Sequence, residues 1–198
     1  WHIVKIIDVD GTGLNEGWFS HPETIRSYAS DFYRPPGYKQ VEWTFPVKYK
    51  TLNFQSPLPE TQLLMDLIKE YKPDFMYSLH NSGFGGAYYY ITEESSDLFP
   101  HLHRIPRSFG IPLSLGEPEV PFFEHLAPAI FKLFTIKELY DHMEKHTDKD
   151  PKDLLRMGAG SDEYAMEGCN TFSLVTEVPY FYDKRVEEKG ELDKTRKE

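Results

Sequence analysis

Two residues of this chain combine a reactive side chain with a position directly after an apolar run. His80 follows Phe75–Leu79, and Glu177 follows Phe172–Thr176. An imidazole can bind a metal ion or move a proton, and a carboxylate can act as a general base. Either side chain is costly to bury without a partner. Taken alone, each local pattern fits a core histidine or an ordinary strand-end carboxylate better than a reactive site.

The elements around these two residues are expected to place both at strand ends. The residue pattern predicts one strand over Asp74–His80 and another over Asn170–Glu177, which Pro179 closes. His80 is then followed by a glycine-rich loop, Asn81–Gly86. In α/β proteins, reactive groups gather where strands end and loops open onto a crevice.

Hydrophobic periodicity predicts the remaining elements. The apolar run Ile3–Val9 is expected to be a buried strand, and Gly86–Thr92 a further strand. A helix is expected from Pro59, with an apolar stripe at helical spacing, and Pro73 ends it. Helical stretches are also expected within Glu93–Phe109, Phe131–His146 and Ser161–Gly168. The predicted fold class is therefore α/β, with a mixed, largely buried β-sheet flanked by helices.

The bulk composition limits the classes of function. A net charge of −10 opposes a nucleic-acid partner, because phosphate binding needs clustered Lys and Arg. No apolar run approaches the ~20 residues of a spanning helix, so no membrane partner is expected. The single cysteine, Cys169, excludes an internal disulfide and favours a reducing, cytoplasmic location. Residues 184–198 are expected to form a charged helix or tail.

Four segments, in chain order, resemble motifs of the zinc carboxypeptidase family of metallopeptidases. Asp8–Gly11 is similar to the family's N-P-D-G turn, and Pro59–Thr61 is similar to its S/P-E-T helix start. Asp74–Asn81 resembles the S-x-H strand end. Gly158–Tyr164 followed by Phe172–Glu177 resembles the G-S-S-D-D-Y and Y-S-F-T-x-E run. Together the matches span nearly the whole chain.

This resemblance implies a phosphorylase/hydrolase-like fold and a zinc-dependent hydrolase that cleaves a peptide or amide bond. His80 would be a ligand of one Zn²⁺ ion. Glu177 would be the general base that accepts a proton from the attacking water and passes it to the leaving amine. The implied substrate is a peptide or an acyl-amino acid. Residues 1–183 would form a partial catalytic domain, and the oligomeric state stays open.

The chain also departs from the family pattern. The family takes its first two zinc ligands from an H-x-x-E motif upstream of the turn, and none of the eight histidines here has Glu three residues later. We therefore expect an upstream part of the domain to be absent from this sequence. The alternative is a non-catalytic, metal-free binding module on the same fold. Thr44 and Phe45 stand where the family's substrate-binding Asn-Arg pair is expected, and Arg34 or Arg156 fits a surface arginine better than a displaced substrate contact.

Further histidines and aromatics are weaker candidates. His142 and His146 are one turn apart on a predicted helix, a spacing that can bind metal, but their charged neighbours indicate a solvated face. His101 and His103 would point apart on an extended chain. The Tyr88–Tyr90 run could line a substrate cleft, although core aromatics are the commoner explanation. Substrate-binding residues stay unassigned.

Overall fold

The protein is mixed α/β, as predicted, with a five-stranded mixed sheet flanked by helices. The computed structural model describes residues 1–20, 24–116 and 118–188. The chain divides into two compact units. Unit 1 comprises Trp1–Met76 and Leu133–Ser173, and unit 2 comprises Tyr77–Lys132 and the chain from Leu174 onward.

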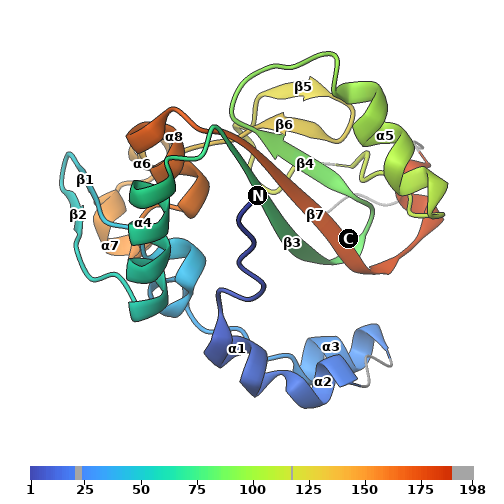
Figure 1. Ribbon diagram of the computed structural model, residues 1–198, viewed down its shortest axis with the longest axis horizontal. Helices are drawn as coiled ribbons and strands as arrows, with labels where there is room; N and C mark the ends of the chain where they lie inside the picture. The colour runs from blue at the N-terminus through green and yellow to red at the C-terminus, as the bar shows by residue number, and fades with distance from the viewer. Residues whose placement is uncertain (21–23, 117, 189–198) are drawn as a thin grey trace. The chain divides into compact units, whose positions relative to one another are not determined.

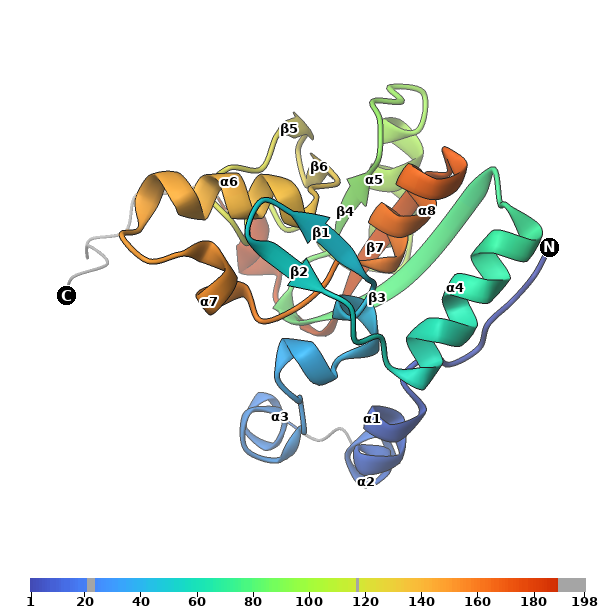
Figure 2. The same cartoon turned by 90° about the vertical axis from the view of Figure 1, so that its left-hand side faces the viewer.

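Unit 1 is mainly helical, and its core forms around α4 (Pro59–Tyr71) and α8 (Ser161–Cys169), which lie side by side (Figures 1 and 2). Met65 and Ile68 of α4 and Ala165 of α8 are buried in this core. The other elements of unit 1 are α1 (Val9–Leu14), α2 (Glu16–Ser20), α3 (Ile25–Asp31), η1 (Gly37–Lys39), η2 (Val41–Trp43), β1 (Val47–Tyr49), β2 (Leu52–Phe54), α6 (Ile136–His146) and α7 (Pro151–Leu155).

The start of α4 and its apolar stripe agree with the sequence prediction. Pro59 occupies the first turn, where its missing N–H costs nothing, and the helix ends at Lys72, whose φ of 42° is left-handed. The expected helix over Phe131–His146 starts later, at Ile136, where Thr135 and Glu138 form a capping box. Phe131 belongs to a strand instead, because its backbone pairs with β4.

The predicted strand over Ile3–Val9 is wrong. Residues 1–8 form no strand, and Ile3 is 84 % exposed. Asp8 instead caps α1, because its carboxylate accepts a hydrogen bond of 2.9 Å from the N–H of Gly11. An apolar run becomes a strand only where another strand satisfies its backbone groups, and no strand pairs with these described residues.

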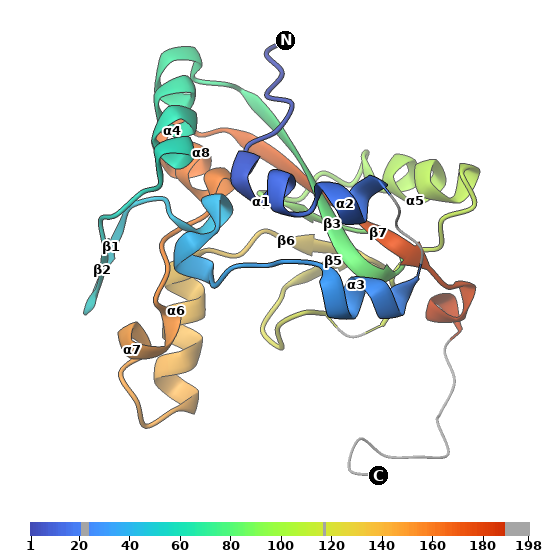
Figure 3. The ribbon, with the colours of Figure 1, turned by 90° about the horizontal axis from the view of Figure 1, so that it is seen from below.

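Short helices follow this segment. Trp18 of α2 packs against Tyr28 and Phe32 at ring-centroid distances of 5.4 and 5.2 Å, and Figure 3 shows α2 and α3 as neighbours. Elsewhere in unit 1, a Cβ on Gly158 would lie 2.1 Å from the carbonyl oxygen of Phe45. This close approach therefore requires glycine.

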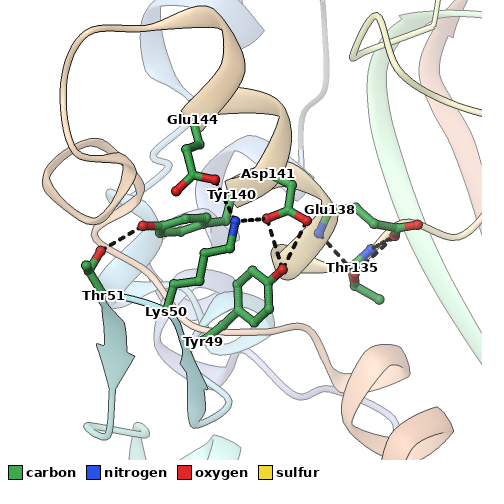
Figure 4. Close-up of polar contacts among 8 residues, drawn as sticks. All are labelled: Tyr49, Lys50, Thr51, Thr135, Glu138, Tyr140, Asp141 and Glu144. Atoms are coloured by element: carbon green, nitrogen blue, oxygen red, sulfur yellow. Dashed lines mark hydrogen bonds and ion pairs between the residues drawn. The ribbon is translucent and has the colours of Figure 1, made fainter.

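A charged clamp fastens the β1–β2 turn to α6 within unit 1 (Figure 4). Lys50 Nζ lies 2.7 Å from Asp141 Oδ1 and 2.5 Å from Glu144 Oε2, and the Tyr49 hydroxyl donates to both carboxylate oxygens of Asp141. Thr51 adds a hydrogen bond to the Tyr140 hydroxyl. These hydrogen bonds to Asp141 and Glu144 raise the pKa of Lys50, and the hydrogen bond from Lys50 lowers that of Asp141. Lys50 thus bridges two carboxylates of α6, which gives the clamp a structural role.

Unit 2 is built around the sheet, with strand order β3-β7-β4-β6-β5 (Figure 1). β4 pairs parallel with β6 and antiparallel with β7, and β5 pairs antiparallel with β6. One face is covered by α5, because the Tyr89 hydroxyl donates to the carbonyl of Leu102 at 2.9 Å. The elements are β3 (Phe75–Gly85), β4 (Tyr88–Ile91), α5 (Phe99–Ser108), β5 (His125–Ala127), β6 (Ile130–Lys132), β7 (Phe172–Tyr182) and η3 (Lys184–Glu187). β3 and β7 begin in the last residues of unit 1.

Burial follows strand position in the sheet. Every residue of β4 is buried, and the middle of β7 is largely buried. β3 lies at the edge, and there Tyr77 and Leu79 are exposed. No helix in the described ranges is both long and apolar enough to cross a membrane. Part of the predicted charged tail, residues 189–198, lies outside the described residues.

Candidate functional site

His80 lies inside β3 and not at its end, which corrects the sequence prediction. The strand runs on through the expected glycine-rich loop as far as Gly85. Glycines that permit a loop are also compatible with an extended edge strand when a neighbour supplies hydrogen bonds. The tight approach comes next, at Gly86, where a Cβ would lie 2.4 Å from the backbone carbon of Leu113. His80 therefore lies in the middle of the edge strand β3.

Glu177 likewise lies within its strand, because β7 continues through Pro179 to Tyr182. Glu177 is the last residue of β7 that pairs with β4, opposite Tyr88. Pro179 is tolerated because it lies beyond that pairing, where its missing N–H interrupts no ladder to β4. Glu177 is 9 % exposed, so the strand places a carboxylate at a largely buried position.

The sheet brings the two predicted residues together. β3 and β7 are neighbours, and His80 Nδ1 lies 3.4 Å from Glu177 Oε1. The imidazole is about one-third exposed, and the carboxylate is only 12 % exposed. A carboxylate beside an imidazole can orient the ring, stabilise its charged form and share a proton with it. Both groups belong to unit 2, so one compact unit carries the pair.

Two tyrosines lie on the same face of the sheet as Glu177, and their hydroxyls hold a second acidic residue, Glu119. Tyr88 is its cross-strand partner, and Tyr90 lies two residues further along the same face of β4. The Tyr88 hydroxyl donates to Glu119 Oε1 at 2.5 Å, and that of Tyr90 donates to Glu119 Oε2 at 3.1 Å. Burial, the Glu119 hydrogen bond and the charge of Glu177 raise the pKa of Tyr88. Both phenols therefore act as neutral hydrogen-bond donors.

The Tyr88–Tyr90 run was the sequence signal for the sheet face that carries Glu177. No sequence signal pointed to Glu119. Period-two alternation puts Tyr88 and Tyr90 on one side of a strand and Tyr89 on the other. Glu119 comes from an irregular segment between α5 and β5. Its role depends on a contact across 29 and 31 residues of sequence, which no local pattern encodes.

The donor set for zinc is incomplete among the described residues. His80 supplies an imidazole nitrogen, a ligand type that zinc accepts. Within residues 1–20, 24–116 and 118–188, no group of three His, Cys, Asp or Glu side chains is placed to hold a metal ion. His80 and Glu177 alone therefore do not make the three-ligand set that a catalytic zinc uses.

The weaker metal candidates have other contacts. The rings of His142 and His146 stack at 4.1 Å, and His146 Nδ1 lies 2.7 Å from the carbonyl oxygen of His142. His103 Nε2 lies 2.8 Å from the carbonyl oxygen of Pro128, and His101 Nδ1 lies 3.4 Å from an Arg104 nitrogen. These contacts give each pair an ordinary structural role.

The four residues considered for contacts to a substrate carboxylate are either buried or paired with neighbouring residues. Thr44 and Phe45 are fully buried in unit 1, where the Thr44 hydroxyl is 2.5 Å from that of Thr61. Arg34 forms an ion pair of 3.0 Å with Glu42, and Arg156 donates to the carbonyl of Asp153. Thr44 and Phe45 are thus core residues of unit 1, and the two arginines have local partners.

Unit 1 holds a second buried carboxyl, Glu163 in the first turn of α8. Its Oε2 accepts a hydrogen bond of 2.8 Å from the N–H of Ile136, at the start of α6, and its Oε1 is buried without a hydrogen-bond partner. Burial raises the pKa of Glu163 to about 7. The sequence placed this residue in a family-like motif without giving it a role.

Comparison with known proteins adds no family assignment. A scan against protein-family models finds no match for this chain, and searches of curated proteins and of solved structures return no significant match. The resemblance to zinc carboxypeptidases therefore rests on the four sequence motifs alone.

Proposed function

We propose that this chain carries part of the active site of a zinc-dependent hydrolase that cleaves a peptide or amide bond in a peptide or acyl-amino acid. The observation that carries the proposal is the 3.4 Å separation of His80 Nδ1 and Glu177 Oε1. The two residues belong to separate motifs, 97 positions apart in the sequence, and both match the zinc carboxypeptidase pattern. Their proximity on adjacent strands supports a shared role.

In this proposal, Glu177 is the general base and His80 is one ligand of a single Zn²⁺ ion. The ion, when bound, supplies Lewis-acid activation of water and carbonyl. Glu177 accepts the water proton and returns it to the leaving nitrogen, a task favoured by its largely dry position between strands. The other two zinc ligands are not assigned, because no group of three His, Cys, Asp or Glu side chains among the described residues is placed to hold a metal ion. Both side chains project from neighbouring strands, β3 and β7, of unit 2.

The composition of the chain bears on its partners and its cellular compartment. The net charge of −10 supports a function without nucleic acid, and a single cysteine supports a reducing, cytoplasmic setting. We also propose that residues 1–183 form part of a catalytic domain related to the zinc carboxypeptidases.

The second candidate is a non-catalytic, metal-free binding module on the same fold. It is supported by the partly exposed imidazole of His80 beside Glu177, which offers hydrogen-bonding groups to a ligand without a metal. On this alternative, Glu177 and His80 hold a ligand by hydrogen bonding, and no bond is cleaved.

The first test is the zinc content per chain, measured by elemental analysis after dialysis against micromolar zinc. We expect zinc in the wild-type chain and its loss in His80→Ala. His146→Ala is the matched control, because it removes an exposed imidazole remote in sequence from the pair and should leave the zinc content unchanged. Equal zinc in the wild type and in His80→Ala would show that His80 is not a ligand.

The second test separates the base from the ligand. Glu177→Gln should keep the zinc content of the wild type, while the hydrolysis rate of acyl-amino-acid amides falls by about 10²–10⁴-fold, the usual range for loss of a general base. Hydrolysis at the wild-type rate in Glu177→Gln would remove Glu177 from the mechanism. Zinc bound to the wild-type chain through His80 would favour the hydrolase over the binding module, because a metal-free module needs no zinc ligand.

A further inference from the structure

A cavity of about 340 Å³ lies in unit 2 at the hairpin of β5 and β6, whose strands are labelled in Figure 1. Residues 114–116 and 125–129 line it together with Phe131, and its described lining includes neither His80 nor Glu177. Ligand pockets range upward from about 300 Å³. The volume of this cavity therefore suits a compact ligand with about one or two rings.

The backbone of the hairpin departs from a regular ladder in two places, and both belong to the cavity lining. The register shifts between His125 and Ala127, so Leu126 has no residue opposite it in the described ladder. Ala129 has a φ of 58°, a left-handed value that glycine adopts more readily, and it is 3 % exposed. Bulges and strained residues of this kind concentrate beside binding sites, where they turn backbone groups away from the ladder.

The charge of the lining selects against ions. The described residues that line the cavity include no Lys, Arg, Asp or Glu. On the hairpin, the charged neighbours of the lining are Glu124 and Lys132, and they pair with each other at 3.3 Å. An ionised ligand would lose hydration on entering and would meet no opposite charge in the described lining, so an uncharged ligand is favoured.

Two rings favour a flat ligand. The rings of His125 and Phe131 meet edge to face, with centroids 4.6 Å apart and planes at 69°. A further aromatic ring can add to such a pair by a stacked or an edge contact. The lining also offers polar groups, namely the Ser114 hydroxyl and the backbone of the extra residue Leu126. A ring that carries one neutral polar group matches both kinds of surface.

An added peptide strand suits this place less well than a compact ligand. β5 is an edge strand, but it has only three residues and contains the register shift. Short and bulged edges present few backbone groups in register to an incoming strand. The occupant that fits the hairpin is therefore a small molecule.

We propose that the cavity at the β5–β6 hairpin binds a small, uncharged, planar ligand that combines an aromatic ring with a neutral hydrogen-bonding group. Aryl amides and uncharged nitrogen heterocycles belong to this class. The inference does not rest on the proposed hydrolase function, because the site uses neither His80 nor Glu177. Binding here and zinc-dependent hydrolysis can therefore be measured separately.

The test compares probes of similar shape and different charge. Benzamide is neutral, benzoate is anionic and benzamidine is cationic, while cyclohexanecarboxamide keeps the amide but replaces the flat ring. Each probe is titrated into the full chain at neutral pH without zinc and followed by NMR chemical shifts. We expect benzamide to bind about fivefold more tightly than either ionised probe and about threefold more tightly than cyclohexanecarboxamide.

Two measurements locate the bound probe. Nuclear Overhauser contacts should join the benzamide ring protons to the methyl groups of Leu126 and Ala127. Gly116→Phe should weaken benzamide binding about tenfold or more, because a Cβ at Gly116 meets nothing within 4 Å and a phenyl ring can extend into the cavity from its lining. Gly17→Phe is the matched control, since Gly17 is equally open but belongs to α2 of unit 1.

No detectable binding of benzamide to the wild type would overturn the site, and tighter binding of benzoate or benzamidine would overturn the uncharged class. Benzamide bound without contacts to Leu126 and Ala127 would be an adventitious additive only. Wild-type affinity in folded Gly116→Phe would also overturn the proposal, and if that variant does not fold, the contacts in the wild type decide. Hydrolysis without benzamide binding would reject this site alone, and benzamide binding without hydrolysis would reject the hydrolase alone.

Discussion

Glu163 in unit 1 and Glu177 in unit 2 are both largely buried glutamates, yet their surroundings differ. Glu163 is 5 % exposed, and its partner is a backbone N–H at the start of α6. Glu177 is 9 % exposed, and its neighbour is the titratable ring of His80. Glu163 completes a helix end, where the first N–H groups have no intrahelical acceptor. Glu177 leaves its proton-accepting oxygens near a group that can itself gain or lose a proton.

The comparison shows that a perturbed carboxyl is not by itself an active-site marker. The pKa of Glu163 is raised to about 7, a value that suits a general base. Its contacts among the described residues are structural: one oxygen accepts from the Ile136 N–H, and the other is buried without a hydrogen-bond partner. Geometry therefore ranks Glu177 above Glu163, although burial alone would rank them the other way.

The largest expected difference between the two glutamates is in stability. Glu163→Ala should lower the free energy of unfolding by about 3 kcal/mol at about pH 5.5, because it leaves the Ile136 N–H without an acceptor and opens a cavity. Glu177→Ala should change it by less than about 1 kcal/mol, since its partner His80 is partly exposed and can turn to water. Urea denaturation of both variants measures this. A larger loss in Glu177→Ala than in Glu163→Ala would reverse the assignment of roles.

The pH dependence of stability sharpens the same comparison. The pKa of Glu163 is about 7 in the folded state, whereas the ordinary value of a glutamate in the unfolded chain is 4.5. The folded state therefore binds the proton more tightly. Its contribution is complete below pH 4.5 and is lost as the pH rises through 7, to a total of about 3 kcal/mol.

Glu163→Gln should flatten this decline, because an amide of the same size has no proton to lose, while Glu177→Gln serves as the matched control. Denaturation midpoints at several pH values between about 4 and 8 provide the measurement. If the slope between these limits were the same in Glu163→Gln and in the wild type, Glu163 would not be the group that titrates.

The sequence was sufficient for those features that local chemistry determines. Pro59 and the apolar stripe behind it predicted α4, and the apolar runs before His80 and Glu177 predicted two strands that do form. It could not predict where those strands end, because pairing with neighbours extends β3 through Asn81–Gly85 and β7 through Pro179. The same reason explains why Ile3–Val9 is no strand: its pattern is suitable, but no described strand pairs with it.

The candidate site was predictable only in part. His80 and Glu177 were identified from motifs, whereas their contact depends on the strand order β3-β7, which no single motif encodes. Glu119 was missed because its hydrogen bonds to Tyr88 and Tyr90 arise from an irregular segment that folds back over β4. Glu163 was part of a recognised run, but its role depends on the start of α6, 27 residues earlier.

Asp141 provides a third kind of carboxylate and the smallest expected effect. It is exposed and paired with Lys50 and Tyr49, and these hydrogen bonds lower its pKa. Asp141→Asn keeps an acceptor for the Tyr49 hydroxyl but removes the charge, so a small fall in the melting temperature is expected. Because exposed ion pairs are screened by salt, that fall should disappear at about 1 M NaCl, where the Debye length is about 3 Å.

Lys50→Met and the double variant complete a mutant cycle, in which the coupling between the two residues should also vanish at high salt. A fall that persists unchanged in about 1 M NaCl would mean that Asp141 acts through its hydrogen bonds and not through its charge. Glu163 would show the opposite behaviour, because its position is closed to solvent ions and its effect should be independent of salt. Salt, burial and pH together therefore distinguish a carboxylate that fastens a surface turn, one that completes a helix end, and one that lies beside a titratable histidine.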